Sequence, residues 1–95
     1  MAAMIVPVES KVKYLRRRDA ELESLLRIST GPELFELGKK VGHQIKGNAA
    51  TFEFNDLTEL GKRLEAACLA EDGQAVQSVV QELKQQVTAL LEQYS

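Results

Sequence analysis

The sequence has little cysteine and no long hydrophobic run. Its single cysteine, Cys68, leaves no intrachain disulfide to form, and no cluster of Cys, His and carboxylate residues has the spacing of metal ligands. The apolar run 4–8 is too short for the hydrophobic region of a signal peptide and is broken by Pro7. No other segment approaches the roughly 20 apolar residues of a membrane span. We therefore expect a soluble, cytoplasmic protein that binds neither a metal nor a membrane.

An excess of charge of one sign is also absent. The chain has 12 Lys and Arg against 14 Asp and Glu residues, and its net charge of -2 gives no support for nucleic-acid binding. Its 95 residues suffice for one small domain over 1–95, but not for a nucleotide-binding catalytic domain beside it. No Gly-rich phosphate loop is present either. We therefore expect no ATP-dependent kinase activity and no cofactor.

The first half of the chain predicts two helices joined by a turn. The first runs from about Ser10 to Ile28, and the second begins at Pro32 and ends near Phe52. The helical period turns five side chains of the first helix inward: Tyr14, Leu15, Leu22, Leu25 and Leu26. The same period turns a run of three arginines mostly outward, as a solvated face: Arg16, Arg17 and Arg18.

The second half predicts two more helices. Asp56 and Glu59 have the spacing of a capping box at the start of the third, which ends before Asp72 and Gly73. The fourth runs from about Gln74 to Gln93 and has the strongest amphipathic pattern in the sequence. Since no segment alternates like a strand, the apolar stripes are buried most simply in an all-α, antiparallel up-and-down four-helix bundle, closed as a monomer.

The only histidine, His43, is predicted to face outward on the second helix. A helical wheel centred on Leu34 gives one apolar stripe and puts His43 about 180° from it. Three lysines share the outward face: Lys39, Lys40 and Lys46. An outward histidine is either a reactive group or an idle surface residue, and the wheel does not separate these alternatives.

Gly47, one turn after His43, favours the reactive group. Glycine inside a helix costs about 1 kcal/mol relative to alanine, and core packing does not explain a glycine that faces solvent. Gly47 removes a side chain beside the imidazole and so leaves space for a bulky partner group. Gly38 and Gly42 lie nearer the apolar stripe and predict the close approach of a neighbouring helix.

These residues resemble a known family, the histidine phosphotransfer (HPt) domains of bacterial phosphorelays. The resemblance rests on His43–Phe52 followed by Leu57, Leu60–Gly61 and Leu64–Glu65. With Tyr14–Arg18 and the last helix it covers about residues 14–93, and it leaves 1–12 as a lead-in. It implies a four-helix bundle whose exposed histidine accepts a phosphoryl group from a receiver-domain aspartyl phosphate and passes it to another receiver.

The resemblance also implies residue roles. His43 matches the phosphoacceptor, Lys46 the lysine that neutralises the phosphoryl oxygens, and Gly47 the small residue beside them. The phosphorylated nitrogen would be Nε2. A neutral imidazole has a free ring nitrogen at cytoplasmic pH, so no internal general base is needed. Magnesium would belong to the receiver's acidic pocket.

The expected partners are response-regulator receiver domains, of which a hybrid sensor kinase is one source. Lys39 and Lys40 are predicted to attract an acidic receiver surface, with a plain solvated face as the alternative, and Gln44 is assigned to the same partner-binding surface. One departure from the family concerns Glu53, which stands where such domains most often have glycine. Because a left-handed backbone strains Glu53, we expect either a longer second helix or a different turn, with an added carboxylate near the partner surface.

Two other functions remain open at this point. A helical adaptor would bind signalling partners and leave His43 unmodified. The dimerisation domain of a sensor kinase is a weaker alternative, because it builds its bundle from two chains, whereas the four segments here can close a core alone.

Overall fold

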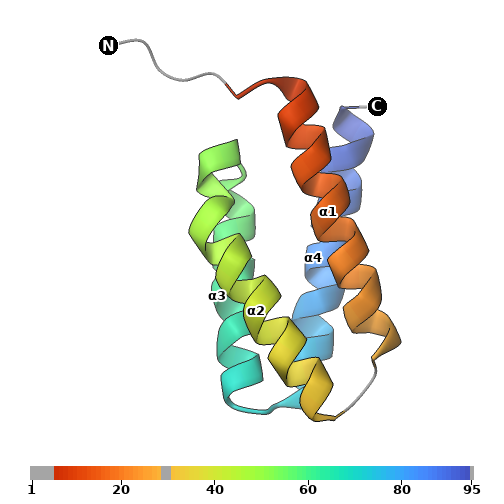
Figure 1. Cartoon of the computed structure of the whole chain (residues 1–95), viewed down its shortest axis with the longest axis vertical. Helices are drawn as coiled ribbons and strands as arrows, with labels where there is room; N and C mark the ends of the chain where they lie inside the picture. Colours follow the sequence, from red (N-terminus) through yellow and green to blue (C-terminus); the bar gives the residue numbers. More distant parts are fainter. Residues whose placement is uncertain (1–5, 29–30, 95) are drawn as a thin grey trace.

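A computed structural model describes residues 6–28 and 31–94, which form an antiparallel, up-and-down bundle of four helices (Figure 1). Its elements are α1 (Val8–Arg27), α2 (Pro32–Asn48), the short 3-10 helix η1 (Ala50–Phe52), α3 (Asn55–Leu69) and α4 (Gly73–Gln93). No strand occurs in this part of the chain. The predicted all-α bundle is therefore confirmed.

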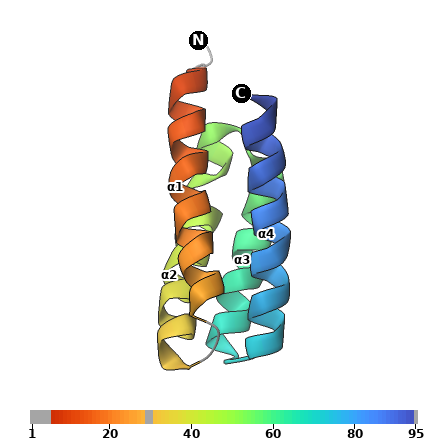
Figure 2. The ribbon, with the colours of Figure 1, turned by 90° about the vertical axis from the view of Figure 1, so that its right-hand side faces the viewer.

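Within the bundle α2 packs most closely against α3, and α4 packs about equally against α1 and α3. The start of α1 and the end of α4 lie at the same end of the molecule, as two views of the ribbon show (Figures 1 and 2). Every helix contributes fully buried aliphatic side chains to one core: Leu15, Leu22, Leu34, Val41, Ile45, Leu57, Leu64, Val76, Val80, Leu83 and Val87. Because each such side chain stabilises the fold by about 1.5–3 kcal/mol, this shared stripe holds the bundle together.

Two glycines bring α2 and α3 into direct backbone contact. A Cβ atom added at Gly42 would lie 2.7 Å from Glu65 N and 2.9 Å from the carbonyl oxygen of Gly61. A Cβ atom added at Gly61 would in turn lie 2.8 Å from Lys46 N. Since neither position has room for a side chain, the pair fixes the separation of the two helices. The predicted close approach at Gly42 is confirmed.

The end of α2 differs from the expectation. The α-helix stops at Asn48 instead of near Phe52, and η1 follows. Glu53 takes the left-handed conformation, with φ 68° and ψ 26°. Glu53 N donates to the carbonyl of Ala50 at 2.9 Å and Phe54 N to that of Ala49 at 2.9 Å, which is the Schellman pattern. The turn is therefore the one that glycine usually closes. These backbone bonds offset the roughly 1–3 kcal/mol cost of a left-handed glutamate.

The ends and faces of the other helices contain further corrections. α1 begins at Val8, two residues before the predicted start, and so extends into the expected lead-in, of which residues 1–5 lie outside the described part. Leu26 is 39% exposed instead of inward. Arg18, expected outward, is buried against the ring of Tyr14. Since a long arginine side chain can lie along apolar surface, the helical period alone is a poor guide to whether an arginine is buried or exposed.

The caps of α3 and α4 differ from each other. The residue before α3 is Phe54, with no side-chain cap, so the capping box predicted from Asp56 and Glu59 does not form. Asp72 does cap α4, because its Oδ1 accepts from Ala75 N at 3.1 Å. Cys68 is buried, as predicted. No helix in the described ranges is long and apolar enough to cross a membrane.

Candidate functional site

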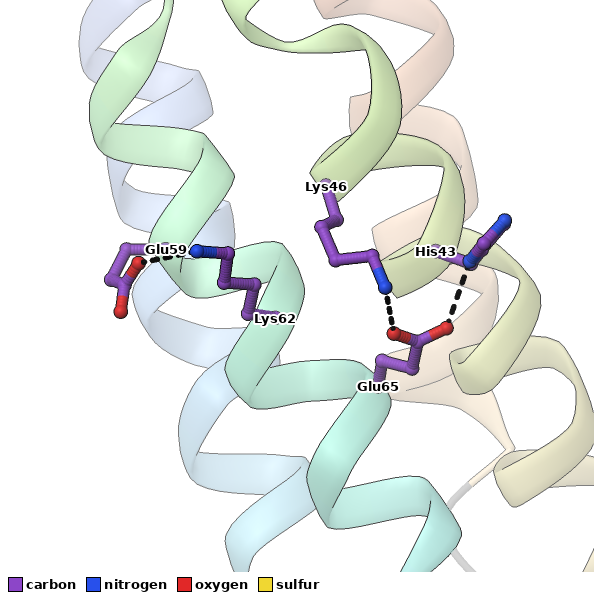
Figure 3. Close-up of polar contacts among 5 residues, drawn as sticks. All are labelled: His43, Lys46, Glu59, Lys62 and Glu65. Atoms are coloured by element: carbon purple, nitrogen blue, oxygen red, sulfur yellow. Dashed lines mark hydrogen bonds and ion pairs between the residues drawn. The ribbon is translucent and has the colours of Figure 1, made fainter.

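The side chain of His43 projects from the middle of α2 and is 69% exposed, which confirms the predicted outward position. Its Nδ1 atom lies 2.9 Å from Oε2 of Glu65, which projects from the neighbouring helix α3 (Figure 3). The immediate partner of the imidazole is therefore a carboxylate, not one of the lysines expected around it.

Glu65 binds a second group of α2 with its other oxygen. Lys46 donates from Nζ to Oε1 of Glu65 at 2.6 Å, so one carboxylate bridges two side chains that lie three residues apart on α2 (Figure 3). The hydrogen bond from Lys46, followed by that with His43, lowers the pKa of Glu65 below its ordinary value, against the opposing effect of partial burial. Glu65 is therefore ionised at neutral pH.

The ionised carboxylate selects the form of the imidazole. A carboxylate without a proton can only accept hydrogen bonds, so Nδ1 of His43 must be the donor. In a neutral ring the proton on Nδ1 leaves the lone pair on Nε2. The arrangement therefore presents Nε2 as a nucleophile on an exposed ring.

The glycine contact between α2 and α3 explains why Glu65 reaches both partners. Glu65 follows Gly61 by one helical turn and lies on the same face of α3. Because the Gly42–Gly61 contact removes any side chain between the two backbones, short hydrogen bonds can span the helices next to it. The packing of the fold thus sets the geometry of the site.

The other predicted site residues spread around His43 instead of clustering on it. Gly47 faces open space, since a Cβ atom there would meet nothing within 4 Å. Lys40 is exposed on the side of α1, near enough to Glu21 to act on its pKa, and Lys39 is exposed on the side of α3, where it lines a cavity with Leu69. The two lysines thus lie on opposite flanks of α2.

Gln44 is half-buried and does not lie openly on the outward face. Its Oε1 atom is buried and has no hydrogen-bond partner within the described residues. Those residues also contain no group of three or more His, Cys, Asp and Glu side chains that could hold a metal ion. The chemistry available at the site is therefore that of one imidazole, one carboxylate and one ammonium group.

Sequence reasoning missed the role of Glu65, although the motif included the residue. The signal that could have found it is its spacing from Gly61. A glycine opposite Gly42 predicts close helices, and a carboxylate one turn later on that face can reach the outward side of α2. The sequence alone does not give the register of α3 against α2, which decides whether Glu65 reaches His43.

Comparison with known proteins identifies the family. No curated protein and no solved structure gives a significant match to the chain. A family model described as the Hpt domain matches residues 13–93, which include all of α2 and α3 and hence the whole site. The chain therefore belongs to the Hpt domain family, whose members serve in histidine phosphotransfer in phosphorelays and interact there with receiver domains.

Proposed function

We propose that the protein is a phosphorelay carrier that accepts a phosphoryl group on Nε2 of His43 from a receiver-domain aspartyl phosphate and gives it to another receiver. It has no ATP-dependent kinase activity of its own in this proposal. The observation that carries it is the pairing of Nδ1 with Glu65 on a ring that is 69% exposed. An idle surface histidine needs no such partner.

The transfer step balances without an internal base. The lone pair of Nε2 attacks phosphorus, an N–P bond forms, and the P–O bond to the aspartyl carboxyl breaks, which releases the receiver's carboxylate. The proton on Nδ1 stays in place, so the ring becomes cationic as the bond forms. The Glu65 carboxylate, 2.9 Å away, stabilises that developing charge.

Lys46 and Gly47 support the same step in different ways. Lys46 keeps Glu65 ionised. It also lies one helical turn after His43, so its positive charge is close to the phosphoryl oxygens that His43 would receive. Gly47 leaves the approach to the ring open. Lys39, Lys40 and Gln44 belong to the flanks of the receiver-binding surface in this proposal.

The test is incubation with a panel of phosphorylated receiver domains, followed by mass spectrometry at neutral pH, where acid-labile phosphohistidine survives. We expect one added phosphoryl group that maps to His43. Absence of transfer from every receiver of a broad panel, with binding retained, would favour the non-phosphorylated adaptor instead.

A further inference from the structure

A cavity of about 410 Å³ lies away from His43, between α1 and the end of α2. Three cationic side chains of α1 line it: Lys13, Arg17 and Arg18. No carboxylate is among its lining residues in the described part of the chain. Glu21 pairs with Arg18 and offsets one of these charges, and Lys13 and Arg17 leave a local excess of positive charge in a protein of net charge -2.

Arg18 is the feature that marks the cavity as a binding site. Its side chain is only 3% exposed, and its guanidinium lies over the ring of Tyr14, 5.1 Å from the ring centre. Nε forms a salt bridge with Oε1 of Glu21 at 2.7 Å. Nη1 is a buried donor without a hydrogen-bond partner among residues 6–28 and 31–94. A buried guanidinium that is paired with one carboxylate and still has a free donor at Nη1 can bind a further anionic group.

The surroundings of Arg18 add further donors and an apolar wall. Lys13 and Arg17 are exposed, and neither forms a salt bridge with the described residues. Tyr14 donates its hydroxyl hydrogen to Oδ1 of Asn48 at 2.7 Å, which leaves the amide hydrogens of Asn48 as donors at the cavity edge. The rings of Tyr14 and Phe52 stack with their centres 4.4 Å apart and form the apolar side.

We propose that this cavity binds a small organic oxyanion, a carboxylate or phosphate group attached to an apolar or aromatic stem. The oxyanion pairs with Nη1 of Arg18 and with the charges of Arg17 and Lys13, and the stem packs on the Tyr14–Phe52 stack. The proposal is independent of phosphoryl transfer, because none of these side chains contacts His43 in the described structure.

The test is a two-dimensional 1H–15N NMR titration of the whole chain with benzoate, phenyl phosphate and, as an uncharged control, benzyl alcohol. For at least one of the two anions we expect saturable shifts at the Arg18 Nε–H and at the amides of Ser10 and Asn48, with a dissociation constant on the order of 1 mM. Absence of saturable shifts with both anions, or equal shifts with benzyl alcohol, would overturn the proposal.

Arg17→Gln and Arg16→Gln form a matched pair for the same titration. Both arginines are exposed on α1, but only Arg17 lines the cavity. We expect Arg17→Gln to weaken binding about threefold or more and Arg16→Gln to leave it nearly unchanged, since screened surface charges contribute little at a distance. Equal weakening by both variants would mean attraction by the general charge of α1 and would refute a defined site.

Discussion

Two charged clusters of similar design tie this bundle together. On one side Glu65 of α3 bridges two nitrogen groups of α2, His43 and Lys46. On the other side Lys84 of α4 bridges two carboxylates of α1, because its Nζ atom contacts Asp19 and lies 2.7 Å from Glu23. Each cluster thus joins one closely packed helix pair through a single central charge.

The difference between the clusters lies in what surrounds the charges. The cluster of Lys84 contains only permanently charged groups at neutral pH, so its role is structural. The cluster of Glu65 contains an exposed imidazole and follows a glycine contact between the helices. In the proposed function this difference makes the cluster of Glu65 a site, because one member would act as a nucleophile and the packing leaves that member accessible.

The largest expected effect is the loss of phosphoryl acceptance when His43, in the cluster of Glu65, is replaced. His43→Gln should abolish phosphoryl acceptance, because no other histidine is present, and should leave the fold intact, since the side chain is largely exposed. Receiver-dependent labelling measured by mass spectrometry tests the first point, and circular dichroism tests the second. Labelling of the variant at the wild-type level would remove His43 from the proposed role.

The next largest effect is a slower transfer when the charge of Glu65 is removed. Glu65→Gln keeps the shape but removes the charge that stabilises the cationic ring, so transfer should slow by about tenfold. Single-turnover kinetics with one phosphorylated receiver measure this. Glu59→Gln is the matched control, because Glu59 also forms an ion pair on α3, with Lys62 at 3.6 Å, but not with His43 (Figure 3). Equal rates for the two variants would contradict the role of Glu65.

A pair of glycine substitutions tests the packing beneath the site. Gly42→Ala should lower the free energy of unfolding by about 1–2 kcal/mol, because the new methyl group meets the backbone of α3, and this outweighs the gain in helix propensity. Gly47→Ala, on the same helix but in open space, should raise it by up to about 1 kcal/mol. Urea unfolding decides the signs. A gain of stability in Gly42→Ala would refute the close contact.

Removing the central charge of the structural cluster should have a smaller effect. Lys84→Met breaks both ion pairs with α1 and should cost about 0.5–1 kcal/mol of stability, because the partners are partly exposed. Transfer to His43 should keep its wild-type rate, measured in the same single-turnover assay. A slowed transfer would show that the two clusters are coupled through the bundle.

The smallest effects are the opposite responses of the clusters to pH. The pKa of Glu65 is lowered in the folded protein. Its contribution to the free energy of unfolding is therefore present above the pKa of the unfolded chain, about 4.3, and is lost as the pH falls through the pKa of the folded state. Hydrogen bonds to Asp19, then Glu23, raise the pKa of Lys84 in the folded protein. Its contribution to the free energy of unfolding is therefore present below the pKa of the unfolded chain, about 10.4, and is lost as the pH rises through the pKa of the folded state.

Stability measured against pH tests this contrast. The difference in the free energy of unfolding between the wild type and Glu65→Gln should shrink in acid. The corresponding difference between the wild type and Lys84→Met should shrink in strong alkali. A Glu65→Gln difference that persists unchanged at the acid end would mean that the bridge from Glu65 does not stabilise the fold.

The sequence predicted the features that depend on one helix alone. The exposure of His43, the open space at Gly47 and the buried stripe follow from the helical period, which needs no knowledge of neighbours. Helix ends near Pro32 and Gln93 were also predicted, because turn residues and amphipathic limits mark them locally.

What the sequence did not predict depends on how one helix meets another. The partner of His43 is set by the register of α3, and the guanidinium of Arg18 is buried over the ring of Tyr14. The turn at Glu53 is closed by backbone bonds to Ala49 and Ala50, which overrule the local preference against a left-handed glutamate. The first two outcomes are tertiary effects, whereas the turn is a local effect of the backbone.

The most direct test of the central claim is 15N NMR of the imidazole ring after phosphorylation by a receiver. With a single histidine in the chain, the ring signals have one assignment. We predict a phosphoryl group on Nε2 and a proton on Nδ1. A phosphoryl group on Nδ1, or a ring that stays unmodified while receivers bind, would contradict the account.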